Sequence, residues 1–205
     1  MKKILIGFIF VPVIIFAVGA VIVLIVGKAP EIVEVAKPTT LYATDYYDFS
    51  GLTKDEIRAN RIQAQAKKAD FLVGHPAALI AKVDINFKPR QSGDTCKAKI
   101  TKFDISLTYV YPRLTSLPNV SSGVAAEWNR YIAALKVHEE GHAKIEVERA
   151  GIMLKELQNL PAYATCEEFN RAWRAKASAF ELETEQIEAV YDRDTQSGKT
   201  QGAIF

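Results

Sequence analysis

The chain has 205 residues and a formal net charge of +2 at pH 7, from 26 basic and 24 acidic residues. This length is sufficient for one domain with short appendages. The basic residues alternate with acidic ones along the chain instead of forming a basic run, so we expect no nucleic acid as a partner.

The N-terminal segment has the composition of a membrane span. Residues 4–27 are an unbroken apolar run that follows two lysines. A helix over this run would be roughly 36 Å long, which is enough to cross a hydrocarbon core of about 30 Å. We therefore expect residues 1–28 to anchor the chain in the inner membrane and to place the rest in the periplasm. A signal sequence that is cleaved before secretion is the alternative.

The remainder divides into a tether and a folded domain. Residues 29–44 contain two prolines and charges of both signs, which is typical of a linker between membrane and domain. We expect residues 45–205 to form the domain, with a first strand in the aromatic segment 45–50.

Alternating apolar and polar residues predict two further strands that form an antiparallel pair with one wet face. The first covers 79–87, and a turn around Gly93 leads into the second. In the second strand the apolar residues change face between Ile100 and Phe103, which predicts a bulge or bend there. The prolines from Pro112 onwards are expected to end the β region.

Three helices are predicted from caps and periodicity. The first covers 54–69 and begins with a capping box, the second is capped by Ser121 or Ser122 and ends before Pro161, and the third begins with a capping box at Thr165. Together these elements predict an α+β fold, in which helices pack on a small antiparallel sheet and a zincin-like motif helix lies across it.

The second helix contains the segment His138 to His142, which reads H-E-x-x-H. Two histidines four residues apart lie one turn apart on the same face, so both rings can reach one divalent ion. Glu139 then lies beside the ion, where it can act as general base on a water. Two histidines with a purely structural role are the alternative, but buried imidazoles need partners. Gly141 costs roughly 1 kcal/mol in mid-helix, which indicates a close approach by another group.

A catalytic zinc needs a third protein ligand and an open position. Asp192 is the best candidate, because it stands beside the last residue of the apolar stripe of the third helix, Tyr191. His75 or another acid of the third helix is the alternative ligand. Tyr191 could donate a hydrogen bond to a developing oxyanion. The expected cofactor is therefore Zn²⁺, held by His138, His142 and Asp192.

Cys96 and Cys166 are the two cysteines of the chain. In an exported protein two cysteines usually pair, so we expect a disulfide between them. Two buried free thiols are the alternative.

The domain resembles a bacterial family of predicted secreted zinc-dependent proteases that is catalogued as a domain of unknown function. The resemblance covers about residues 45–205 and departs from the family pattern at Ser197, where a histidine is frequent. It rests on the following segments: 46–51, Cys96, 111–113, 128–131, 138–142, Cys166, 191–195, Gly198 and 201–203. It implies a zinc-dependent peptidase.

Motif and resemblance together predict a membrane-anchored, envelope-facing zinc metallopeptidase that hydrolyses peptide bonds of a peptide or protein substrate. The alternative is a non-catalytic envelope protein that keeps the fold, with or without a structural metal, and binds a partner.

Overall fold

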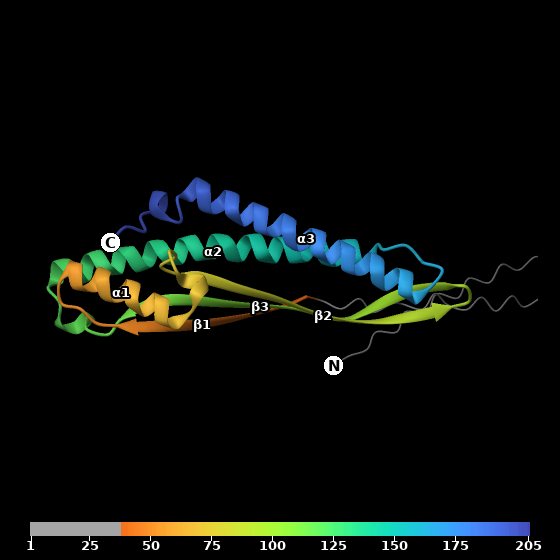
Figure 1. Ribbon diagram of the computed structural model, residues 1–205, viewed down its shortest axis with the longest axis horizontal. Helices are drawn as coiled ribbons and strands as arrows, with labels where there is room; N and C mark the ends of the chain where they lie inside the picture. The colour runs from red at the N-terminus through yellow and green to blue at the C-terminus, as the bar shows by residue number, and fades with distance from the viewer. Residues whose placement is uncertain (1–37) are drawn as a thin grey trace, which may run out of the picture. The chain divides into compact units, whose positions relative to one another are not determined.

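The computed structural model describes residues 38–205 (Figure 1), and the predicted anchor over 4–27 and most of the predicted tether lie outside them. The described residues form an α+β domain, as predicted. No helix among them is long and apolar enough to cross a membrane. In chain order the elements are β1 (Thr39–Phe49), α1 (Lys54–Lys68), η1 (Asp70–Leu72), β2 (Ala78–Ser92), β3 (Thr95–Leu114), η2 (Leu117–Asn119), α2 (Ser122–Gln158), α3 (Cys166–Thr195) and η3 (Lys199–Gln201).

The sheet has three strands in the order β1-β3-β2. β2 and β3 form the predicted antiparallel hairpin, and β1 runs parallel to β3. The prediction of a wholly antiparallel sheet is therefore wrong, because the sheet is mixed. The chain passes through α1 after β1 and then adds the hairpin with β3, not β2, next to β1. The alternation of side chains shows which face of a strand is buried, but not which edge of a hairpin a third strand joins.

The predicted bulge is present in β3. The register of the β2–β3 ladder shifts after Asn86, and Thr101 is the extra residue on β3. This residue lies between Ile100 and Phe103, where the apolar pattern changes parity. Because of the bulge, the apolar residues on both sides of it face the helices.

The β region extends further than predicted. β3 continues through Pro112, which lies beside Tyr47 of β1, and ends at Leu114. The ladder with β2 begins only at Val110, where Ala78 is its partner. Beyond that point β3 has a single neighbour, so a residue without an N–H can be accommodated there.

The helices begin at the predicted caps. Side-chain oxygens of Thr53, Ser121 and Thr165 accept hydrogen bonds from main-chain amides three residues further on. Glu56 and Glu168 complete the two capping boxes. α2 and α3 lie side by side in opposite directions and cover one face of the sheet, while α1 packs near β1 (Figure 1).

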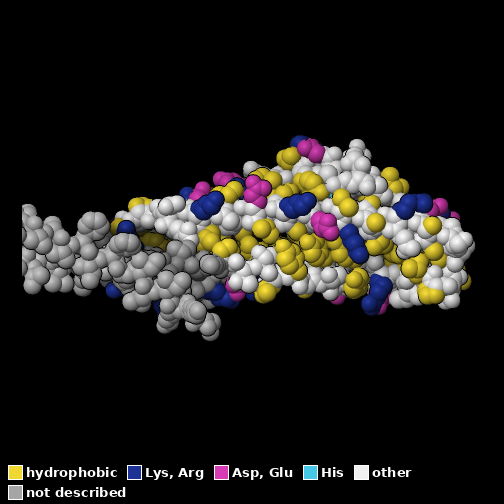
Figure 2. Space-filling model, turned by 180° about the vertical axis from the view of Figure 1, so that it is seen from behind, with side chains coloured by type: hydrophobic (Ala, Val, Ile, Leu, Met, Phe, Trp, Pro, Cys, Tyr) yellow, Lys and Arg dark blue, Asp and Glu magenta, His cyan; other side chains and the backbone are white. Residues whose placement is uncertain are grey.

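Two apolar clusters fill the space between helices and sheet. One contains the aromatic side chains Tyr47, Phe49, Trp128 and Tyr131, and the other packs β3 against α2 around Phe103. The H-E-x-x-H segment lies on α2 between Leu135, which belongs to the first cluster, and Ala143, which belongs to the second. Figure 2 shows one face of the molecule, on which hydrophobic side chains gather in a band with charged side chains at its margins.

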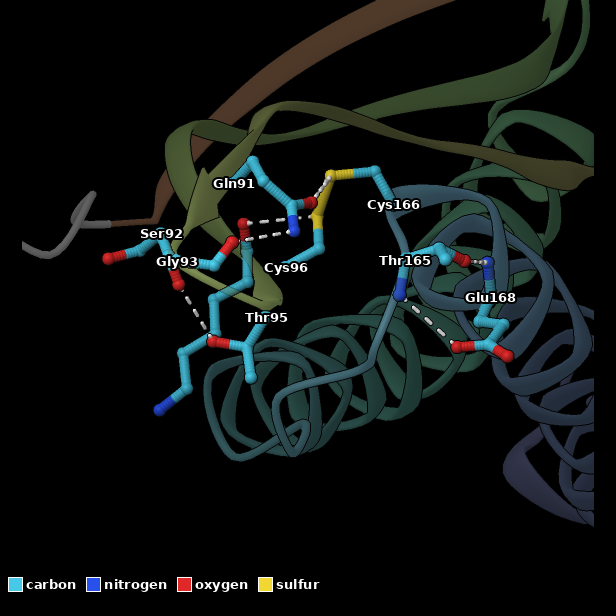
Figure 3. The surroundings of a disulfide bond; sticks show 9 residues. Gln91, Ser92, Gly93, Thr95, Cys96, Thr165, Cys166 and Glu168 are labelled. Atoms are coloured by element: carbon cyan, nitrogen blue, oxygen red, sulfur yellow. Dashed lines mark hydrogen bonds between the residues drawn. A yellow bond between two sulfur atoms is a disulfide. The ribbon is translucent and has the colours of Figure 1, made fainter.

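The predicted disulfide between Cys96 and Cys166 is present, and it links the start of β3 to the first turn of α3 (Figure 3). Tyr163 reinforces the link: its main chain exchanges two hydrogen bonds with Cys96, at N···O distances of 2.7 and 3.0 Å. The far end of the hairpin, with its turn at Gly93, is therefore fixed to the N-terminus of α3.

Removing the disulfide should destabilise the fold. The bond joins residues separated by 70 positions, and closing a loop of that size stabilises by about 4 kcal/mol in the chain-entropy model. We expect the double variant Cys96→Ala/Cys166→Ala to lose that amount of unfolding free energy in urea titrations. Reduced wild-type protein controls for the cavity that alanine leaves, and an unchanged urea midpoint in both would contradict the prediction.

Candidate metal centre

The structure brings the predicted metal-binding residues together. His138 and His142 on α2 are 4% and 8% exposed, and Asp192 reaches them from the last turns of α3. Asp192 Oδ1 lies 3.0 Å from His138 Nε2 and 3.3 Å from His142 Nε2. The potential ligand atoms of the three residues all lie within 4.8 Å of one another. They form a buried group that could hold a metal ion.

The second nitrogen of each ring faces an oxygen atom, but only that of His138 makes a hydrogen bond. His138 Nδ1 lies 3.1 Å from Gln201 Oε1, so an N–H at Nδ1 donates to that oxygen and Nε2 carries the lone pair. His142 Nδ1 faces Glu188 Oε1 at 3.3 Å. Metal-binding histidines ordinarily donate their other N–H to a carboxylate or carbonyl oxygen. Two imidazole nitrogens and one carboxylate oxygen are also a common donor set of catalytic zinc, so the residues fit this ion.

Burial and neighbouring charges shift the pKa values of the two rings in opposite directions. It lowers the pKa of His138, and the neighbouring His142 lowers it further, which favours the neutral form that binds metal. Burial also lowers the pKa of His142, but Glu188, Glu139 and Asp192 together outweigh burial and raise it.

The motif glutamate lies in the wall of the same site. Glu139 is 3% exposed, and burial raises its pKa to about 7, with further contributions from the negative charges of Asp192 and Glu188. A carboxyl that titrates near neutral pH can accept a proton and give it up again, which is what a general acid–base group requires.

The close approach predicted at Gly141 is made by Tyr191. A Cβ atom at position 141 would overlap the Tyr191 hydroxyl group. The Tyr191 ring stacks on His138 with centroids 5.2 Å apart, and its hydroxyl donates to the His138 carbonyl at 3.2 Å. Gln201 Nε2 donates to the same hydroxyl at 3.0 Å. The hydroxyl is thus engaged in positioning His138, and its predicted role toward an oxyanion stays a prediction.

A turn after α3 carries the supporting glutamine. Gln196 and Ser197 have positive φ values of 52° and 51°, and Gly198 follows at +83°. A Cβ at Gly198 would lie 3.2 Å from His138 Cβ, so the turn packs tightly on the histidine and delivers Gln201 beside it. The sequence did not single out Gln201 as a site residue, and it offered Glu188 only as one of the acids of the third helix. For Glu188 a signal existed, because it lies one helical turn before Asp192 on the same face.

A pocket of about 250 Å³ adjoins the group. Its walls include Glu139 on α2, Glu188 on α3, Ser197, and the segment from His75 to Leu79 at the start of β2. His75, one of the alternative ligands, lines the pocket but does not belong to the group of His138, His142 and Asp192. Buried Gln65 holds the preceding turn, because its Nε2 donates to Leu72 O at 2.7 Å and to His75 O at 2.6 Å.

The protein is therefore an α+β domain in which His138, His142 and Asp192 could hold a metal ion. The chain belongs to the family described as bacterial protein of unknown function (DUF922), which matches residues 44–199. No curated protein and no solved structure matches the chain. The expected kinship with a bacterial family of unknown function is confirmed, and the family description specifies no activity. A disulfide in a bacterial protein indicates a location outside the cytoplasm.

Alanine at position 141 should destabilise the protein. A glycine-to-alanine change inside a helix ordinarily stabilises by about 1 kcal/mol, but here the new methyl group meets the Tyr191 ring, and overpacking costs roughly 1–3 kcal/mol. Gly151 on the same helix is the matched control, because no atom lies within 4 Å of its virtual Cβ. Urea unfolding should show a loss for Gly141→Ala and a gain for Gly151→Ala. Equal stability of the two variants would contradict the contact.

Glu146 should make stability pH-dependent. Burial, with the nearby charge of Glu188, raises its pKa from 4.5 to about 7. The folded state therefore binds the proton of the Glu146 carboxyl more tightly than the unfolded state does. The unfolding free energy that this proton contributes is fully present below pH 4.5 and is lost as the pH rises through about 7. In metal-free protein, Glu146→Gln should raise the melting temperature at pH 8 and leave it nearly unchanged at pH 4.5. The exposed Glu148→Gln is the control, and a stabilisation of equal size at both pH values would count against the assignment.

Proposed function

We propose that the protein is a zinc-dependent peptidase of the bacterial envelope, with His138, His142 and Asp192 as zinc ligands and Glu139 as general base. The observation that carries this proposal is the convergence of two imidazole Nε2 atoms and one carboxylate oxygen beside a buried glutamate, in the wall of a pocket. A bound zinc ion supplies a Lewis acid that activates water and polarises a carbonyl group.

The residues of the chain divide the remaining work. Glu139 takes the proton of the attacking water and passes it to the nitrogen of the leaving amine. Gln201 holds the ring of His138 through a hydrogen bond at Nδ1. Glu188 lies beside His142 Nδ1 and contributes negative charge there. Tyr191 stacks on His138 and keeps its main chain in place.

The surroundings favour an extended substrate. The pocket lies where the chain enters β2, and β2 is an edge strand of the sheet. An edge strand has free main-chain groups that can pair with an extended peptide. We therefore propose a peptide or protein substrate, cleaved on the outer side of the inner membrane. Residues 4–27 would anchor the protein there, or would be removed if the protein is secreted.

A second candidate is a non-catalytic envelope protein. Asp192 Oδ1 lies within 3.3 Å of both histidine Nε2 atoms, so the three side chains can also satisfy one another without an ion. In that case the group would be a buried polar network, and the domain would act by binding a partner.

Metal analysis combined with a peptidase assay separates the two candidates. We expect one zinc per chain, lost in Asp192→Ala. Glu139→Gln should keep the zinc and lose peptide hydrolysis by roughly a hundredfold or more, because a positioned acid–base group contributes about 10²–10⁴ in rate. Its exposed neighbour provides the matched control, Glu140→Gln, which should leave hydrolysis unchanged. Protein that binds no zinc, or a fully active Glu139→Gln variant, would refute the peptidase.

A further inference from the structure

A second, larger pocket adjoins the one at the metal-binding group. It measures about 580 Å³ and shares Pro76 and Ser197 with the smaller pocket. A substrate that extends beyond the metal-binding group on this side therefore enters it. Its walls come from α1, from the turn before β2, from Tyr131 of α2 and from the C-terminal residues.

Arg61 of α1 gives this pocket its chemical character. Its Nη1 donates to Gln65 Oε1 at 2.9 Å, and its guanidinium lies 5.8 Å from the centre of the Tyr131 ring. Its Nε is buried and has no hydrogen-bond partner. Within residues 38–205 no carboxylate pairs with Arg61. Its neighbours Gln65 and Tyr131 carry no charge, and burial raises the pKa of the adjacent Tyr47 hydroxyl, so Tyr47 carries none either.

A half-buried guanidinium without an anion is costly, because desolvation is not offset by a charge of opposite sign. Its planar array of N–H groups matches a carboxylate in particular. Lys199 adds a second positive charge to the wall, and no acidic side chain lines this pocket. The main-chain oxygen of Phe205 in the same wall accepts from Arg58 Nε at 2.9 Å and is not a partner of Arg61. The pocket therefore attracts an anion.

The walls also have an apolar component. Ile62, Val73 and Ile204 are 59%, 62% and 70% exposed, and they line the pocket together with Phe205. An anion with an apolar body, such as an amino-acid residue with its carboxylate, buries apolar surface here and pairs with Arg61 at the same time. A small inorganic anion would gain only the second of these contributions.

We infer that this second pocket, the Arg61 pocket, binds a carboxylate of the peptide substrate and so directs the scissile bond to the metal-binding group. The inference rests on the proposed function for its substrate. The charges support the same orientation: Glu139, Glu188 and Asp192 line the smaller pocket and repel a carboxylate, while Arg61 and Lys199 attract it. The carboxylate is either the free C-terminus of the peptide or an aspartate or glutamate side chain.

Binding can be measured without metal or catalysis. In the ¹⁵N-labelled full chain, treated with a chelator, the Arg61 Nε–H resonance reports contact with an anion and is assigned by its loss in Arg61→Lys. The probes are N-acetyl-dialanine with a free carboxylate, the same peptide as its amide, and a capped peptide whose single carboxylate is on a glutamate side chain. We expect the free acid, the glutamate peptide or both to shift this resonance, and the amide to leave it in place. The responding probe identifies the source of the carboxylate. No shift with either carboxylate, or an equal shift with the amide, overturns the inference.

Catalysis provides an independent readout. In zinc-loaded protein, Arg61→Gln should raise KM for the carboxylate-bearing peptide roughly ten- to a hundredfold, as expected for loss of a hydrogen bond to a charged group, and leave kcat nearly unchanged. Arg61→Lys should restore part of the loss. Lys67→Gln, an exposed basic residue on the same helix, is the matched control and should have no effect.

The two hypotheses fail in different ways. Binding of the carboxylate to Arg61 without hydrolysis of any peptide would leave the Arg61 pocket standing and refute the peptidase. Hydrolysis with equal KM for acid and amide peptides in wild type and Arg61→Gln would support the peptidase and refute the role of Arg61.

Discussion

The candidate centre depends on the contact between Tyr191 of α3 and the backbone of α2 at Gly141. Because position 141 has no Cβ, the tyrosine ring can lie against the helix and stack on His138. The contact fixes the rotation of α3 about its own axis. Asp192, the next residue, then points at both histidines. A glycine that weakens the helix by about 1 kcal/mol is thus offset by the contacts it permits.

The charges around this contact favour a cation. Three carboxylates, those of Glu139, Glu188 and Asp192, surround two imidazoles, and burial disfavours the charged form of His138. Uncompensated negative charge in a poorly solvated site is costly, and the pKa of Glu139 near 7 reflects this cost. A divalent ion at the three ligand atoms would offset the excess charge. The same excess is the reason why a substrate carboxylate is better accommodated beside Arg61.

Local patterns in the sequence were sufficient for some features and not for others. Capping boxes, the bulge at Thr101 and the histidine pair follow from residues close together in the chain, whose geometry is set by one helix or one ladder. Asp192 was predicted because the apolar stripe of α3 places it at the packed face. The mixed sheet and the support from Gln201 depend on how distant segments meet. The turn before Gln201 contains Gln196 and Ser197, which have positive φ although neither is glycine. Their residue types do not predict this conformation.

The site is assembled from three segments that are fixed independently. The disulfide and Tyr163 hold the N-terminus of α3, and the contact at Gly141 holds its C-terminal end. The remaining wall, from His75 onwards, is held by Gln65, whose amide group donates to two carbonyl oxygens of the turn and whose Oε1 accepts from Arg61. One buried glutamine therefore connects the rim of the metal pocket to the Arg61 pocket.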